Sequence, residues 1–242
     1  MNCLNCGQPV TGNFCSNCGQ RAGAKRVTVK DTFLQFLGAY LSLDGPLLRT
    51  IKHLFTQPGT VMKAFIEGRR QLYYKPVPFF IVLTAIYIIL RALLEYDPLK
   101  GQIVDVPEGN PDSIQKNSKL AAYYMVSHID NFLLVLVFAI GGGMKLFFWK
   151  RYNFAEFLSM AFYTTGFYIF YGTFVMLFNY TFDVRYNQIQ LFILIGYLMY
   201  MMASTMGSTP WYRWIAYFFA ALVSLLVYVN VGFLLAYFLV TS

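Results

Sequence analysis

The chain has 242 residues, of which 57% are hydrophobic, 19% aromatic and only 12% charged, and its mean hydropathy is +0.50. These values are typical of polytopic membrane proteins and argue against a large soluble core. The formal net charge is +8, and residues 1–76 contain ten Lys or Arg against three acids, so seven of these charges precede the first long apolar segment. A basic segment beside a membrane contacts anionic lipid more often than nucleic acid. No cleavable leader is expected, because the first 25 residues lack an apolar core.

All four cysteines lie within the first 18 residues, in two C-x-x-C-G-Q repeats. The repeats place Cys3, Cys6, Cys15 and Cys18 as the four thiolate ligands of a tetrahedral zinc site, and we interpret residues 1–20 as a zinc ribbon. The alternatives are two disulfides or an unligated tail. Four sulfur ligands close the coordination sphere, so the zinc is expected to be structural, and persistent thiolates indicate a reducing compartment and a cytosolic N-terminus. No lysine or arginine lies between the cysteines, so a protein contact or a purely structural role is expected, and no nucleic acid.

Residues 21–27 form a basic linker, and residues 28–75 predict three short amphipathic helices. The first opens at Thr28 with a capping box, the second covers about 46–56, and the third starts at Pro58 and stops at Gly68. Each is too short to cross a bilayer, so we place them on its cytosolic face. The alternative is a small soluble helical domain or a lid packed on the membrane core.

Residues 68–76 form the junction with the membrane. Paired guanidinium groups suit phosphate oxygens and tyrosines suit the headgroup layer. The candidate contacts for a lipid headgroup or an acidic partner are Lys52, Arg69, Arg70, Tyr73 and Lys75. The simpler alternative is that these residues only anchor the protein with its positively charged side toward the cytosol.

Residues 76–242 predict a transmembrane bundle of about five helices, at about 77–94, 124–148, 155–178, 189–207 and 214–240. Arg91 is expected to reach toward the far interface. The loop at 95–119 carries five acids against three lysines and is assigned to the outside, whereas Lys150, Arg151 and Arg213 fall on the side of the basic N-terminus. The C-terminus is then extracytoplasmic. The predicted fold class is an all-α polytopic membrane protein, preceded by amphipathic interfacial helices and a small zinc ribbon.

Few ionisable residues lie in the predicted spans. His128 and Asp130 form a candidate polar pair near the outer end of the second span, where a wetted interfacial pair is favoured over a proton-carrying one. The triplet Gly141–Gly143 indicates close helix packing. The sequence contains no H-E-x-x-H, no G-x-S-x-G and no P-loop, and we assign no catalytic residue.

The N-terminal third resembles a family of uncharacterised bacterial membrane proteins, domain of unknown function 3667. The resemblance is carried by the cysteine ribbon, by Asp44-Gly45 with Leu48-x-Thr50-x-x-x-Leu54, and by the Pro58-Gly59…Gly68-x-Arg70-x-x-Tyr73-x-x-Pro76 core with Phe79-Phe80. It covers about the first 90 residues and implies a zinc-ribbon protein of the bacterial inner (cytoplasmic) membrane, with no reaction attached. The predicted topology is also similar in architecture to Yip1-type five-span proteins.

Three functions are compatible with these observations. The favoured one is a membrane adaptor or scaffold that binds anionic lipid together with a cytosolic or membrane protein partner. The alternatives are a small transporter or permease component and a membrane enzyme acting on lipid, in which His53 would be the base. The shortage of ionisable groups in the spans disfavours the transporter, and a lone histidine gives the enzyme weak support.

Overall fold

A computed structural model of the chain describes residues 2–3, 5–19, 45–99, 114–184, 189–207 and 210–241. It divides into two compact units, Met1–Gly45 and Pro46–Ser242. We call the first the four-cysteine unit and the second the helical body. The expected basic linker and the helix opening at Thr28 lie outside the described residues.

The helical body begins with two short helices, α2 (Pro46–Thr56) and α3 (Pro58–Ile66). The bounds of α2 and the start of α3 agree with those expected from the sequence. Pro58 occupies the first turn of α3, where its missing N–H is not needed, and Gly68 ends the turn after it with a φ of +89°. The helix α4 (Pro76–Leu93) follows after the basic loop and also starts on a proline.

The second expected span is divided in the structure. The helix α5 (Ile114–Ser127) ends before His128, a 3₁₀ turn η1 (Ile129–Phe132) follows, and α6 (Leu133–Phe148) continues the apolar segment. The apolar stretch long enough to span begins at Ile129, five residues after the expected start at about 124. Residues 114–119, expected to be loop, belong to α5.

Three long helices complete the body: α7 (Phe154–Phe182), α8 (Ile189–Met206) and α9 (Tyr212–Thr241). The helix α7 starts on a capping box, in which Asn153 accepts from the Glu156 amide and Glu156 accepts from the Asn153 amide. It continues past the predicted end at 178, and Asn179, expected in a loop, is buried within it.

Four helices in the described residues are long and apolar enough to cross a membrane: α4, the η1–α6 segment, α7 and α9. The fourth expected span, α8, is apolar over Gln190–Met206, a segment one residue shorter than α4. The all-α, membrane-protein fold class is confirmed.

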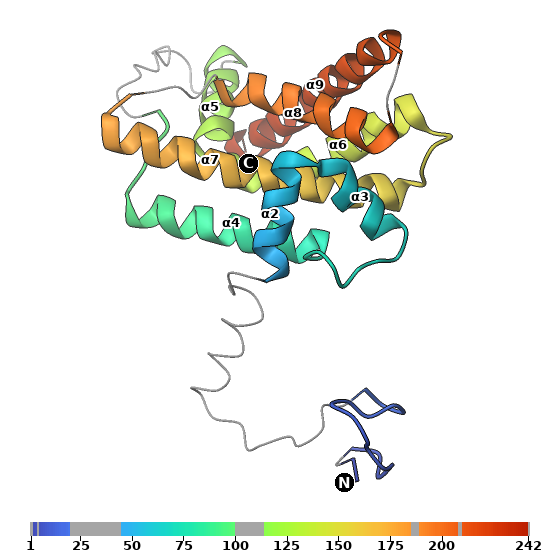
Figure 1. Cartoon of the computed structure of the whole chain (residues 1–242). Helices are drawn as coiled ribbons and strands as arrows, with labels where there is room; N and C mark the ends of the chain where they lie inside the picture. Colours follow the sequence, from blue (N-terminus) through green and yellow to red (C-terminus); the bar gives the residue numbers. More distant parts are fainter. Residues whose placement is uncertain are drawn as a thin grey trace. The chain divides into compact units, whose positions relative to one another are not determined.

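In the body, α7 packs against α4 and α6, while α9 packs against α5, α6 and α8. Figure 1 shows α2 and α3 crossing the long helices, and α3 rests on α8. Small residues set the closest approaches: a Cβ added to Gly143 would lie 2.0 Å from Ser224 Oγ of α9. Large apolar side chains such as Ile81, Ile89 and Phe238 remain exposed on the outer helices, as lipid contact requires.

Candidate functional sites

The four cysteines form a candidate metal centre in which each C-x-x-C repeat makes the same turn. The Gly7 amide donates to the Cys3 carbonyl and the Gly19 amide to the Cys15 carbonyl, both at 2.9 Å. Both glycines have a left-handed φ, +72° and +73°, which strains residues with a Cβ. The repeated Gly thus shapes two equivalent turns that direct the cysteines inward.

The sulfur atoms have the spacing of a metal-ligand set. Cys3 and Cys18 Sγ lie 3.5 Å apart, Cys6 and Cys15 Sγ 3.6 Å apart, and all four lie within 4.8 Å of one another. A tetrahedral ion with bonds of about 2.3 Å to sulfur separates its ligands by about 3.8 Å. The cluster is therefore compatible with one metal ion held by all four thiolates, and no cysteine is paired in a disulfide.

The basic junction is built on hydrogen bonds that join α2 to the loop before α4. Buried Thr50 Oγ1 donates to the Pro46 carbonyl and accepts from the Tyr74 amide at 2.9 Å. His53 Nδ1 lies 2.6 Å from the Tyr73 hydroxyl. Tyr163 of α7 donates to the Tyr74 carbonyl at 2.5 Å. These contacts fix the loop against the helical body.

The candidate headgroup contacts have different environments. Lys52 and Lys75 are exposed, Arg69 is paired with Glu67 at 2.6 Å, and the Arg70 guanidinium lies over the Phe65 ring. Tyr73 differs because it is only 5% exposed and its hydroxyl contacts His53. Burial raises the pKa of Tyr73, and the positive charges of Arg49 and Arg69 partly offset this rise.

The candidate polar pair His128 and Asp130 makes its contacts with other residues. Asp130 Oδ1 accepts from Arg91 Nη1 of α4 at 2.5 Å, and the same guanidinium donates to the Ser127 and Tyr96 carbonyls. His128 stacks on Tyr124 and lies 2.9 Å from Ser127 Oγ. Arg91, expected only to reach toward the interface, instead joins α4 to the α5–η1 corner.

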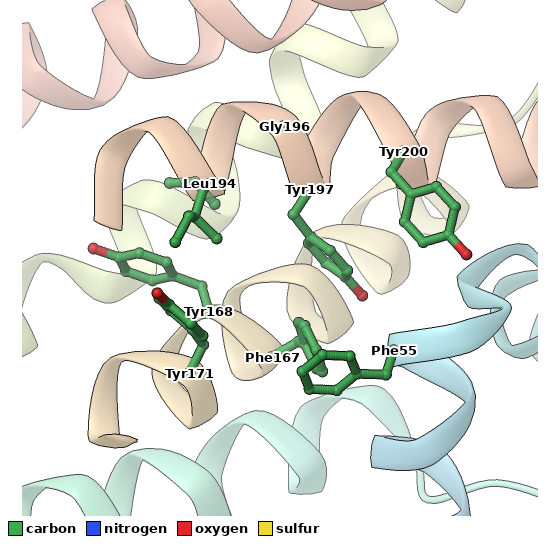
Figure 2. Close-up of a pocket in the computed structure, with 9 residues that line it drawn as sticks. Phe55, Phe167, Tyr168, Tyr171, Leu194, Gly196, Tyr197 and Tyr200 are labelled. Atoms are coloured by element: carbon green, nitrogen blue, oxygen red, sulfur yellow. The ribbon is translucent and has the colours of Figure 1, made fainter. Parts of the chain in front are cut away.

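An aromatic cleft lies between α2, α7 and α8, which Figure 2 shows in close-up. Phe167 stacks on Tyr197 with ring centroids 4.5 Å apart and meets Phe55 edge-on at 5.0 Å. The cleft has a volume of about 370 Å³ and continues from these rings past Tyr168, Tyr171 and Leu194. We name these lining residues the aromatic cleft. Its walls are mostly apolar, so it suits a hydrocarbon chain.

Sequence reasoning did not identify this cleft. The aromatic residues of the later spans have the helical spacing of ordinary packing and interface residues, so their spacing alone does not reveal a cleft. The cleft depends on Phe55 of α2 reaching α7, a contact between residues far apart in the chain.

The comparisons with known proteins find one family. The model of a family described as protein of unknown function (DUF3667) matches residues 44–88. No curated protein and no solved structure matches the chain. The matched segment runs from α2 to α4 and contains Thr50, Tyr73 and Gly59, whose added Cβ would lie 2.2 Å from the Ser204 carbonyl oxygen of α8. The expected resemblance to this uncharacterised family is confirmed over residues 44–88, the segment that fixes α2 and α3 on the helical body.

Proposed function

We propose that this protein is a membrane adaptor. Its four-cysteine unit, held by a structural zinc ion, binds a cytosolic protein, and its helical body resides in the bacterial cytoplasmic membrane and binds anionic lipid. The observation that carries the proposal is the division of the chain: the four-cysteine unit forms a compact unit with its own small core of Cys3, Val10 and Cys15. A zinc-held module of this size folds with its metal and needs no membrane to do so.

The surface of the four-cysteine unit supports a protein partner. Phe14 is 63% exposed, although it directly precedes the buried Cys15. The described residues 5–19 contain no Lys, Arg, His, Asp or Glu. A surface without these cations and with one exposed aromatic ring suits a protein contact, since aromatic residues are enriched where proteins meet and phosphate groups require cations.

The helical body supports lipid binding in two ways. Lys52 and Lys75 are exposed beside the start of α4, where they suit anionic headgroups. The aromatic cleft provides an apolar groove for an acyl chain beside the same α2. A cytosolic N-terminus follows if the positive residues of the body face the cytosol.

The adaptor proposal is tested by photocrosslinking in cells. A photoreactive amino acid is placed at Phe14, and at Gln8 of the same unit as the matched exposed control. We expect one defined protein adduct from position 14, lost in the Cys15→Ser variant while the membrane body remains. Equal labelling from both positions, or an adduct that persists in the Cys15→Ser variant, would contradict an adaptor that uses a folded four-cysteine unit.

A further inference from the structure

A second hollow lies at the end of the helical body where α6 ends and α9 begins. It has a volume of about 230 Å³. Three cations line it, Lys150 and Arg151 from the α6–α7 loop and Arg213 from the first turn of α9. We call it the cationic pocket. Its volume is about eight times that of a liquid water molecule, ~30 Å³, which leaves room for a phosphate group and the atoms attached to it.

No acidic side chain is among the described residues that line the cationic pocket. Neither Arg151 nor Arg213 forms a salt bridge within the described ranges. Glu156, the acid nearest in sequence, is held in the capping box of α7. Lys150 lies over the Trp149 ring at 4.9 Å. Two guanidinium groups and an ammonium group therefore converge without a carboxylate.

The loop that carries two of these cations is held in place. Lys145 Nζ donates to the carbonyls of Trp149 and Tyr152, at 2.9 and 3.2 Å. These bonds close the turn after α6, from which Lys150 and Arg151 line the pocket. A site with a fixed backbone loses less entropy when it binds an anion.

A buried hydroxyl in the same pocket has no partner. Tyr217 of α9 is fully buried and lines the pocket, and its hydroxyl forms no hydrogen bond with the described residues. The positive charges of Arg213 and Arg151 act on this hydroxyl. A buried polar group without a partner is costly, and a bound oxygen acceptor would remove that cost.

The surroundings place the pocket at the level of lipid headgroups. All three tryptophans of the chain lie in the segments that form its rim, Trp149 beside Lys150, and Trp211 and Trp214 beside Arg213. All three are exposed. Exposed tryptophans concentrate at the membrane–water interface, where lipid phosphates lie.

We propose that the cationic pocket binds a phosphate group through Arg151, Arg213 and the Tyr217 hydroxyl, with Lys150 at its rim, and that this group belongs to the headgroup of an anionic lipid. Arginine pairs bind phosphate through several parallel hydrogen bonds, and the tyrosine adds a neutral donor. The inference rests on the proposed membrane placement and lipid binding, and it names the residues that hold the headgroup.

Native mass spectrometry of the full chain, released from nanodiscs of phosphatidylglycerol and phosphatidylcholine, tests the site. We expect the wild-type protein to retain phosphatidylglycerol in preference to phosphatidylcholine. The Arg151→Gln/Arg213→Gln double variant should retain at least about tenfold less phosphatidylglycerol. The matched control Lys116→Gln/Lys119→Gln removes the same charge from α5 and should retain most of the phosphatidylglycerol. Equal retention by wild type and the Arg151/Arg213 variant would overturn the site.

The Tyr217→Phe variant distinguishes a hydrogen bond to the ligand from a general effect of positive charge and from a loss of folding. It removes only the unpaired hydroxyl, so the thermal midpoint should stay the same or rise, while retention should fall about fivefold. Unchanged retention would exclude the hydroxyl as a ligand.

A second experiment adds inorganic phosphate or glycerol 3-phosphate to the protein. If these compounds stabilise wild type but not the Arg151/Arg213 variant, and no lipid is retained, the ligand is a soluble phosphate and the lipid assignment fails. The crosslinking at Phe14 is independent of both results, so the adaptor proposal and this site can fail separately.

Discussion

At the scale of single residues, the Arg91–Asp130 ion pair joins α4 to the corner between α5 and η1. One guanidinium joins a carboxylate and two main-chain carbonyls from three segments. The two side chains are only 18% and 19% exposed, so removing one leaves the other poorly hydrated. We expect Asp130→Asn to lower the free energy of unfolding by about 2–3 kcal/mol, less than the ~3–5 kcal/mol of a fully buried pair, because both side chains are partly exposed.

Thermal unfolding in detergent measures this loss. The control is Asp183→Asn, because Asp183 is exposed and has a left-handed φ of +49° that asparagine also adopts. A midpoint for Asp130→Asn equal to that of the control would mean that the ion pair contributes nothing to the fold.

The His53–Tyr73 contact gives a pH-dependent prediction. Tyr73→Phe removes the 2.6 Å hydrogen bond, and we expect a loss of about 1 kcal/mol at pH 8. Because burial raises the pKa of Tyr73 above its ordinary value of 10.0, the folded state holds this proton more tightly than the unfolded state. Wild type should therefore lose stability as the pH rises past 10, whereas the Phe variant lacks this titration, so the gap between them should shrink.

Unfolding midpoints of both proteins at pH 8 and at pH 10.5 check the prediction. Tyr180→Phe is the control, because Tyr180 is 53% exposed on α7. A gap that stays constant or widens across this interval would show that the Tyr73 hydroxyl is not protected by the fold.

The residues that sequence predicts well are those whose partners are close in the chain. The four cysteines could be identified because each C-x-x-C turn is local and the two turns are twelve positions apart. The cationic pocket could not be identified, because Arg151 and Arg213 come from different loops and Tyr217 resembles any other aromatic residue of a span. Its only sequence signal was the shared positive-inside assignment of Lys150, Arg151 and Arg213.

At the scale of elements, the glycine triplet of α6 offers a pair of variants at adjacent positions. Gly143 faces α9, where an added Cβ would lie 3.1 Å from the Ala220 carbonyl and 2.0 Å from Ser224 Oγ, whereas Gly142 faces open space. We expect Gly143→Ala to separate α6 from α9 and cost about 1–3 kcal/mol. Gly142→Ala should be neutral or stabilising, by up to ~1 kcal/mol, because alanine favours the helix.

Thermal unfolding of the two variants in the same detergent compares the neighbouring positions. Equal midpoints, or a more stable Gly143→Ala, would show that α6 and α9 do not pack closely at this point.

Hydropathy and helix signals predicted the existence of the helices well and some of their ends poorly. Prolines fixed the starts of α3 and α4, because a proline at the first turn is a local steric signal. The sequence left room for a break within 120–151, and the structure has that break at His128, between α5 and η1. The Asn153–Glu156 capping box, readable from the sequence, would have fixed the start of α7.

At the scale of the whole molecule, the length and hydropathy of the apolar segments indicate that the helical body is a membrane protein. They do not indicate what it binds. The aromatic cleft and the cationic pocket both form between segments distant in sequence. Such sites depend on how helices pack, and packing depends on small contacts such as those of Gly59 and Gly143. The family segment at 44–88 also depends on such contacts: Thr50 and Tyr73 bond to Tyr74 and His53 of the same segment, and the Gly59 amide donates to Ser204 of α8.

The division into two units leads to the last prediction, which concerns metal removal. The core of the four-cysteine unit consists of three buried residues and one partly buried cysteine, too little apolar surface to hold a fold without a metal. Chelation, or Cys15→Ser, should therefore release the metal and unfold residues 1–20, whereas the helical body keeps its own core and its unfolding midpoint. Metal content by mass spectrometry and limited proteolysis measure the first effect, and the detergent unfolding midpoint measures the second. Ser16→Ala is the control, because Ser16 is exposed beside the same cysteine and supplies no ligand. If Cys15→Ser also lowered the midpoint of the body or prevented its insertion, the two units would fold as one, and a detachable adaptor module would be excluded.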